Sequence, residues 1–198
     1  MFIALTGTIG SGKTTVAEYL ITQGFLFASG SELIATEVTR RNLPVTREYM
    51  RAIANELRSR DGNAIIDATI VQVASGPNAA IGFLRTKNEI KRLREKVPHA
   101  FLLAIDAPVE IRYDRITKRG ETKDMLNFED FILSENLEAT SDDPDTQNTA
   151  YCLKQADAIV MNDGSLDDLY QKVRARHREV FAKFFPDETE RYRQLLEA

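Results

Sequence analysis

A glycine-rich segment near the start of the chain carries the residues best suited to bind phosphate. It follows the apolar run Phe2–Leu5, and its glycines let the backbone curl so that N–H groups point at phosphate oxygens. Lys13 would supply a cation to the β- and γ-phosphates, and the Thr14 hydroxyl is the expected magnesium ligand. The segment predicts a P-loop that binds ATP with Mg²⁺, and its predicted contacts are Gly7, Thr8, Ile9, Gly10, Ser11, Gly12, Lys13, Thr14 and Thr15.

A second group of candidate phosphate ligands is an arginine series. Arg112, Arg115 and Arg119 are three and four residues apart, so on a helix they share one face. Arginines that converge on a triphosphate can stabilise the charge that develops during phosphoryl transfer, or can stack on adenine. By itself the series is more typical of a solvated helix face with Glu110 and Asp114 as partners. Its position after a buried strand in a P-loop protein favours nucleotide contact.

Short apolar segments alternate with longer amphipathic ones, which predicts a three-layer α/β fold with a parallel sheet. The predicted strands are Phe2–Thr6, Phe25–Ala28, Ala79–Leu84, Phe101–Ile105 and Ala158–Met161. The predicted helices are Lys13–Thr22, Thr46–Arg58, Lys87–Lys96, Val109–Lys118, Phe128–Glu138 and Leu166–Phe185. The segment Ala64–Val71 could be a strand that ends in an acid, but its apolar spacing favours a helix, which would keep Asp67 away from the nucleotide.

Composition and charge restrict the class of protein. A chain of 198 residues fits one domain, spanning 1–198, and its net charge of -4 argues against a general nucleic-acid binder. The single cysteine, Cys152, is read as a half-buried apolar residue and suits a reducing compartment. No apolar run approaches the roughly 20 residues that cross a bilayer, so we expect a cytoplasmic protein without membrane partners.

The remaining polar features have ordinary interpretations. The basic run 85–96 is read mainly as a solvated helix face. The alternative is contact with an anionic acceptor or with RNA, in which Arg85 would be the functional member. The acidic stretch 141–145 is read as a loop. His99 and His177 are expected at the surface rather than as metal ligands. The long terminal helix, about 166–185, is typical of core packing or of a homodimer contact.

The chain resembles the P-loop nucleoside monophosphate kinase-like superfamily, in the branch of the dephospho-CoA kinases and the archaeal and bacterial adenylate-kinase-related proteins. The resemblance rests on Leu5–Thr14, Asn55–Arg58, Leu84–Ile90, the segment from Ile105 through the arginine series, and Ala156–Ser165. It implies a five-stranded parallel sheet in the order 2-3-1-4-5, flanked by helices, and a helical lid at about 119–150.

The same resemblance implies roles for individual residues. Lys13, Arg115 and Arg119 would be the catalytic cations, and Asn162 and Gly164 would lie beside the adenine. The acceptor contacts would be Ser31, Glu32, Arg58 and Arg85. The third strand of this group usually ends in an acid that orients magnesium, whereas Gly82-Phe83-Leu84 stands there in this chain, so Asp106 is the candidate substitute.

Three hypotheses follow from these observations. The first is a kinase that transfers the γ-phosphoryl group of ATP to a nucleotide-like small molecule, of the nucleoside monophosphate or dephospho-CoA type. The second is a nucleotide-binding ATPase or regulatory switch of the same fold, which the missing strand-three acid would allow. The third is an assembly factor or RNA-associated factor that uses ATP binding as a switch.

Overall fold

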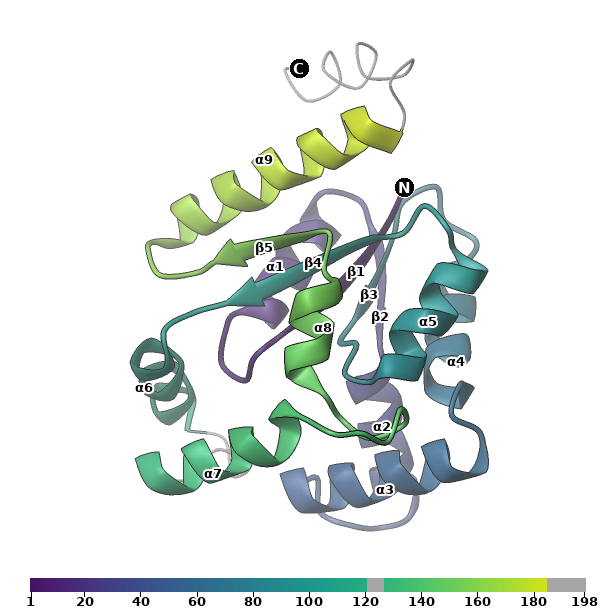
Figure 1. Cartoon of the computed structure of the whole chain (residues 1–198), viewed down its shortest axis with the longest axis vertical. Helices are drawn as coiled ribbons and strands as arrows, with labels where there is room; N and C mark the ends of the chain where they lie inside the picture. Colours follow the sequence, from purple (N-terminus) through teal and green to yellow (C-terminus); the bar gives the residue numbers. More distant parts are fainter. Residues whose placement is uncertain (121–126, 185–198) are drawn as a thin grey trace.

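The computed structural model describes residues 1–120 and 127–184, and its centre is a parallel sheet of five strands. The strands lie in the order β2-β3-β1-β4-β5, as predicted, and every neighbouring pair is parallel (Figure 1). Their bounds are β1 Phe2–Gly7, β2 Leu26–Ser29, β3 Ala79–Gly82, β4 Phe101–Asp106 and β5 Ala158–Met161. Because all five strands run the same way, their carboxyl ends meet at one edge, where open α/β sheets bind ligands.

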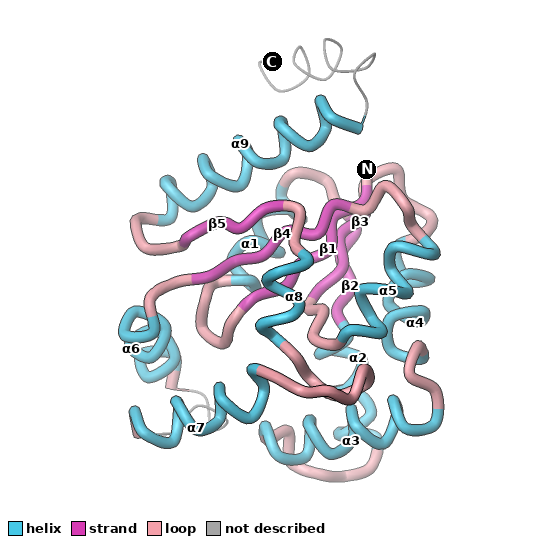
Figure 2. The backbone as a smooth tube through the Cα atoms, in the orientation of Figure 1, coloured by secondary structure: helices cyan, strands magenta, loops and turns pink. Residues whose placement is uncertain are grey.

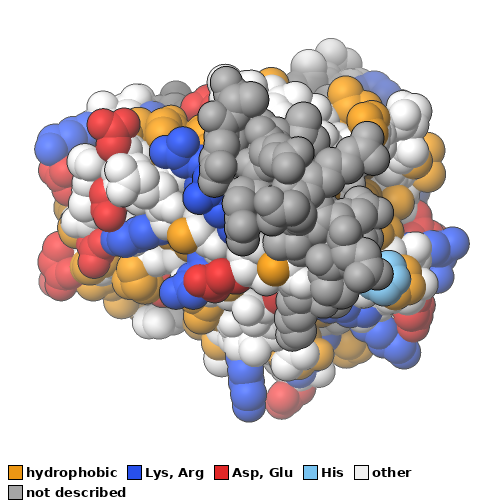
Figure 3. Space-filling model, turned by 90° about the horizontal axis from the view of Figure 1, so that it is seen from above, with side chains coloured by type: hydrophobic (Ala, Val, Ile, Leu, Met, Phe, Trp, Pro, Cys, Tyr) orange, Lys and Arg blue, Asp and Glu red, His pale blue; other side chains and the backbone are white. Residues whose placement is uncertain are grey.

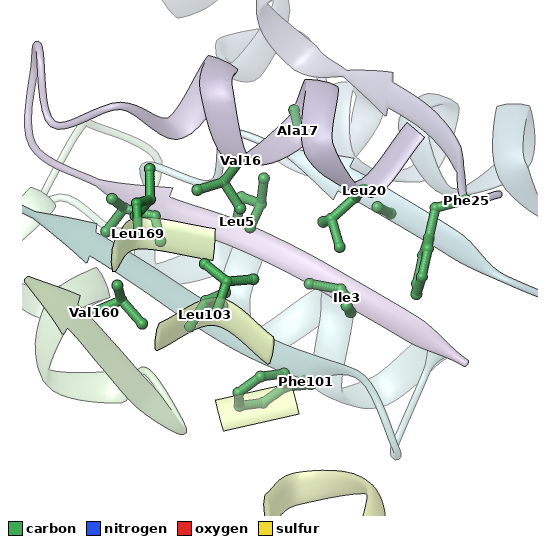
Figure 4. Packing of buried hydrophobic residues seen from close by; sticks show 13 residues of the cluster. Ile3, Leu5, Val16, Ala17, Leu20, Phe25, Phe101, Leu103, Val160 and Leu169 are labelled. Carbon is green, nitrogen blue, oxygen red and sulfur yellow. The ribbon is translucent and has the colours of Figure 1, made fainter. Parts of the chain in front are cut away.

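Helices cover both faces of this sheet (Figure 2). α1 (Lys13–Thr22) and α9 (Leu166–Phe184) cover one face, while α4 (Ala64–Val73), α5 (Lys87–Lys96) and α8 (Thr149–Gln155) cover the other. Figure 4 shows apolar side chains of α1 and α9 meeting those of β1, β4 and β5, with Leu5, Val16, Leu103 and Leu169 at the centre. The central strands are buried on both faces, and successive side chains along them point to opposite faces. Ile3 and Leu5 therefore pack in one layer and Ala4 in the other.

The remaining described helices surround the carboxyl edge. α2 (Gly30–Arg40) and α3 (Arg47–Arg60) pack on α4 through a small apolar cluster of their own. α6 (Val109–Arg119) and α7 (Phe128–Ala139) pack through Ile116 and Phe131, against Ile9 of the glycine loop. In Figure 1, α3 and α7 both lie at this end of the molecule.

The sequence-based elements agree closely with the structure. All five predicted strands are confirmed within two residues at either end, and α1, α5 and β5 have the predicted bounds. The segment at Ala64 is a helix, as predicted, and Asp67 on it pairs with Arg92 of α5 (2.7 Å). Residues 121–126 of the predicted lid, and the predicted helix end at 185, lie outside the described residues.

Two helices were not predicted, and each begins at a side-chain cap. The Ser29 hydroxyl accepts a hydrogen bond from the Glu32 backbone N–H (3.1 Å) at the start of α2. The Asn148 side-chain oxygen accepts a hydrogen bond from the Tyr151 backbone N–H (2.9 Å) at the start of α8. Such caps satisfy backbone donors that a helix start leaves open, so they allow helices that apolar periodicity alone does not reveal.

Two expectations about single residues were wrong. His177 is buried rather than at the surface, because α9 places it against Met1, just before β1. Burial lowers the pKa of its imidazole to about 4. Cys152 is fully buried rather than half-buried, since α8 lies directly on the sheet, and burial raises the pKa of its thiol to about 12.

The described helices and one face of the molecule bear on membrane and polyanion binding. Within residues 1–120 and 127–184, no helix is both long enough and apolar enough to span a bilayer. On the face seen in Figure 3, basic and acidic side chains are interspersed outside the grey region. Such a mixed face does not present the single-sign field that attracts a nucleic acid.

Candidate functional site

A cleft of about 400 Å³ opens at the carboxyl edge of the sheet, between the glycine loop and the helices around it. The glycine loop forms one end of the cleft, and α2, α3 and the segment after β3 form the other. Its lining residues are Ile9, Gly10, Gly12, Lys13, Thr14, Thr15, Ser31, Ile34, Arg47, Met50, Arg51, Ala54, Arg58, Phe83, Arg85, Arg115, Ile116, Arg119, Glu138 and Gln147. We call the first end the donor end and the second the acceptor end, after the predicted contacts that line each of them.

Three glycines allow the loop between β1 and α1 to adopt its shape. Gly7, Gly10 and Gly12 have φ angles of 139°, 74° and 100°, a region that other residues rarely occupy. At Gly12 a Cβ atom would also lie 2.3 Å from the Asn162 side-chain nitrogen, and at Gly7 one would lie 1.9 Å from the Ile105 carbonyl oxygen. The loop therefore depends on glycine for both its backbone angles and its close packing.

Lys13 begins α1 and is buried at the donor end. Its ammonium donates to the carbonyl oxygens of Gly7 (2.9 Å) and Thr8, and it lies 5.7 Å from the centre of the Phe83 ring. Burial, and then the nearby Arg85 guanidinium, lower the pKa of Lys13 to about 7. A buried ammonium in a cationic cleft is stabilised when an anion binds beside it, because the anion offsets both effects.

Residues suited to hold magnesium also lie at this end. Thr14 is exposed and lines the cleft. Asp106 at the end of β4 does not line the cleft, but it accepts hydrogen bonds from the Thr8 hydroxyl of the glycine loop (2.6 Å) and from the Ala107 N–H (2.9 Å). β3 ends at Gly82 and is followed by Phe83, so no carboxylate stands there. Within the described ranges no cluster of three or more acidic, histidine or cysteine side chains forms a metal site. A hydroxyl and a carboxylate are hard oxygen ligands, and Mg²⁺ bound through phosphates needs only one or two of them.

The predicted arginine series divides into two roles. Arg115 and Arg119 line the cleft. Arg112 is buried instead, where it donates to the carbonyl oxygens of Ala107 (2.7 Å) and Ile9 (3.2 Å) and pairs with Glu135 of α7. Arg112 therefore ties the glycine loop, α6 and α7 together, and does not line the cleft.

The segment after β5 contributes one structural contact to the donor end. Asn162 is buried, accepts from the Arg115 guanidinium through its side chain (3.2 Å) and its backbone carbonyl (3.0 Å), and donates to the Ser11 carbonyl oxygen (2.8 Å). It thereby holds Arg115 beside the loop. Gly164 is exposed, packs near Asp168, and does not line the cleft.

Three of the four predicted acceptor contacts line the cleft. Ser31, Arg58 and Arg85 are among its lining residues, whereas Glu32 is exposed in the first turn of α2 and is not. Arg58 is held by a buried ion pair in which its Nε (3.2 Å) and one Nη (2.8 Å) both donate to Glu89. Glu89 also caps α5, so one carboxylate fixes both the helix start and the guanidinium.

Other lining residues at the acceptor end were not predicted. They include Arg47 and Arg51 on α3, Phe83 after β3, Glu138 on α7 and Gln147. Spacing could have identified the two arginines, because Arg47, Arg51 and Arg58 are four and seven residues apart and share a helix face. No local signal identifies Glu138 or Gln147, which come from sequence far from α3.

Comparison with known proteins supports the fold and the family. Residues 3–141 match the AAA_18 family, described as an AAA domain. A UPF0200 protein of Pyrobaculum aerophilum is 31% identical over 172 residues, which cover 86% of this chain and 93% of the relative. A UPF0200 protein of Thermococcus gammatolerans is 25% identical over 185 residues, covering 88% and 92%.

Two solved structures share the architecture. TT1252 from Thermus thermophilus superposes with a TM-score of 0.53 at 23% identity, covering 90% of this chain and 97% of that one. A gluconokinase from Sinorhizobium meliloti gives 0.54 at 17% identity, covering 93% and 95%. At these identities the likeness shows the fold alone. Taken with the family match, the sheet order and the glycine loop, it places this chain in the AAA_18 and UPF0200 families, within the P-loop nucleoside monophosphate kinase-like superfamily.

Proposed function

We propose that the protein is a kinase that transfers the γ-phosphoryl group of ATP to a small nucleotide-like acceptor. The observation that carries this proposal is the continuity of the cleft. A single cavity is lined by Lys13 and Thr14 of the donor end and by Ser31, Arg58 and Arg85 of the acceptor end. Direct transfer needs both substrates in one space, with the reacting atoms about 3–3.5 Å apart.

The residues at the donor end have the chemistry for transfer. Lys13, Arg115 and Arg119 would neutralise the charge that spreads over the phosphoryl oxygens, and this electrostatic contribution dominates catalysis of such reactions. Thr14 and Asp106 would be the protein ligands of Mg²⁺, which when bound would supply positive charge to offset that of the phosphates. The Thr8 hydroxyl holds Asp106 in place from the glycine loop.

One observation favours a second candidate, an ATPase or switch of the same fold. The end of β3, where this superfamily usually keeps an acid, continues into Phe83, which faces Lys13 across 5.7 Å. An apolar ring cannot hold a magnesium-bound water. A protein with weakened metal binding could retain nucleotide binding and lose transfer.

The experiment that separates the candidates is an acceptor panel. The protein is incubated with Mg²⁺ and ATP and with nucleoside monophosphates, deoxynucleoside monophosphates, dephospho-CoA or gluconate, the last because a gluconokinase shares the fold. ADP and a phosphorylated product that form only with one acceptor would support the kinase.

The other outcomes decide against it. ADP formed at the same rate without any acceptor would favour the ATPase, and tight ATP binding with no turnover would favour the switch. Lys13→Ala serves as the control, because turnover that survives this substitution cannot come from the glycine loop.

A further inference from the structure

The acceptor end contains an acidic side chain where an anionic substrate would be expected. Glu138 of α7 is buried and lines the cleft, and its two carboxylate oxygens accept from different arginines. One oxygen accepts from Arg51 of α3 (3.3 Å), and the other accepts from Arg85 after β3 (2.8 Å). The carboxylate therefore bridges two cations that belong to separate elements of the cleft.

The same end has more donors than this carboxylate can satisfy. Among the described residues, three buried side-chain nitrogen or oxygen atoms have no hydrogen-bond partner: Arg51 Nε, Arg58 Nη1 and Arg115 Nη1. All three belong to arginines that line the cleft: Arg51 and Arg58 lie on α3 at the acceptor end, whereas Arg115 lies at the donor end. Arg58 is 4% exposed, and Glu89 engages its Nε and Nη2 but leaves Nη1 free.

Unpaired buried donors are costly, about 1–3 kcal/mol each and more when charged, so proteins rarely keep them without a ligand or water to fill them. A planar carboxylate offers two oxygens, and here both are in use. A phosphate monoester offers three terminal oxygens and a charge of about -1.5 to -2, so it can accept from more guanidinium groups at once.

We propose that Glu138 occupies, in the ligand-free protein, the subsite that receives the phosphate of a phosphomonoester acceptor, and that the acceptor displaces it from Arg51 and Arg85. The phosphate would then accept from these two arginines and from Arg58. The identification of the bound anion as a phosphoryl acceptor rests on the proposed function. The anion subsite itself rests on the contacts alone.

The position of Glu138 on α7 gives the displacement a structural consequence. Glu135, one turn earlier on the same helix, pairs with Arg112, which is bonded to the carbonyl oxygen of Ile9 in the glycine loop. α7 is therefore attached to the donor end by Glu135 and to the acceptor end by Glu138. Phosphate binding at the acceptor end would release the second attachment and leave the first.

A different role for Glu138 predicts the opposite sign. If the carboxylate served to orient Arg51 and Arg85 toward the ligand, its removal would weaken anion binding. If it competes with the ligand, its removal strengthens binding, because a negative charge within contact distance of the anion is lost.

The test is calorimetric titration of the whole protein with inorganic phosphate and with adenosine 5′-monophosphate. The glycine loop is first saturated with a non-hydrolysable ATP analogue, and the series is repeated in Lys13→Ala, so that phosphate at the donor end is not counted. We expect Glu138→Gln to bind both probes about tenfold more tightly than the unsubstituted chain. Gluconate, whose charge is a carboxylate, should gain less.

Glu135→Gln is the matched control, since it removes the same charge from the same helix but leaves the acceptor-end arginines paired as before. Adding Arg51→Gln to Glu138→Gln should reverse the gain. Glu138→Ala repeats the test if the glutamine variant does not fold, as judged by thermal melting. Unchanged or weaker phosphate binding in both Glu138 variants, or an equal gain in Glu135→Gln, would overturn the proposal.

Because these are binding measurements, they are independent of phosphoryl transfer. Tighter phosphate binding in Glu138→Gln together with a silent acceptor panel would leave the anion subsite standing and reject the kinase. Transfer to a phosphate-bearing acceptor, with phosphate affinity unchanged in Glu138→Gln, would support the kinase and reject the role of Glu138 in the anion subsite.

Discussion

The two ends of the cleft are built in different ways. At the donor end the site is formed mainly by the backbone. Three glycines with positive φ, and the carbonyl groups that accept from Lys13, all come from the six consecutive residues 7–12. At the acceptor end the site consists of long charged side chains. They come from α3, from the segment after β3 and from α7, and ion pairs with Glu89 and Glu138 hold them in place.

This difference predicts different sensitivities. A backbone site fails when a side chain is added where none fits, whereas a side-chain site fails when one member of a charge network is removed. It also suggests a division of function, since a phosphate loop suits any triphosphate, while an arginine network can be altered to recognise particular acceptors. Four substitutions or conditions test the comparison.

The largest effect is expected from breaking the buried pair at the acceptor end. Arg58→Met leaves the Glu89 carboxylate buried and without its charged partner, so the free energy of unfolding should fall by about 3–5 kcal/mol. Urea denaturation measures it. Arg60→Met on the same helix is the control, because its pair with Glu56 is exposed, and a comparable loss there would contradict the assigned role of Arg58.

At the donor end, Gly12→Ala should weaken ATP binding by about 2 kcal/mol, roughly thirtyfold, through backbone strain and the contact with Asn162. Calorimetry with an ATP analogue measures this. Gly24→Ala is the matched control for Gly12→Ala. Gly24 also has a positive φ (82°), but a Cβ added there would meet no other residue within 4 Å. Gly24→Ala should lower stability while ATP affinity stays unchanged, and equal losses of affinity would point to a general effect.

The lowered pKa of Lys13 predicts that nucleotide binding depends on pH. With a pKa of about 7 in the free protein, Lys13 is largely neutral at pH 8, and a bound triphosphate favours the ammonium form. Affinity should therefore be constant below pH 7 and fall by up to about tenfold per pH unit above it. Calorimetry at pH 8 in buffers of different ionisation enthalpy should detect the proton that the protein takes up when the nucleotide binds. This proton uptake should be absent in Lys13→Arg, because arginine is already charged at that pH. Binding without proton uptake in the unsubstituted chain would contradict the shift.

The smallest effect concerns the link between the glycine loop and β4. Thr8→Val removes the hydrogen bond to Asp106 and should lower the free energy of unfolding by about 1 kcal/mol. It should also reduce the magnesium dependence of ATP binding. Thr22→Val is the control. It removes an exposed hydroxyl that donates to the Tyr19 carbonyl oxygen in the last turn of α1, away from the glycine loop. If the two variants behave alike, Asp106 has no special relation to the loop.

The prediction of the fold succeeded where the signal was local. β1 and β4 are read from apolar runs bounded by glycine, proline or aspartate, and α1 from the spacing of its apolar residues after the glycine loop. The bounds of all three in the structure agree within a residue. α2 was missed because its start, Ser29-Gly30-Ser31, reads as a loop until the serine cap is seen. α8 was missed because it is short and its apolar face, with Cys152, is recognisable only against the sheet.

The site shows the same division. Lys13, Thr14, Arg115 and Arg119 were chosen from motif and spacing, and all four line the cleft. Arg112 was assigned with its neighbours because all three share a helix face, yet the packing of α7 buries it against Glu135. Spacing determines which side chains share a face, but it does not determine how much of that face a neighbouring element covers.

The sequence by itself determined the glycine loop, the alternation of strand and helix, and hence the parallel sheet, because each depends on residues that are close along the chain. Only the tertiary structure decided that Arg51, Arg85 and Glu138 meet, since they come from three separate elements. It also decided which guanidinium nitrogens are left without partners. Long-range contacts of charged side chains leave no periodic pattern, because their energy depends on burial and mutual distance rather than on order along the chain.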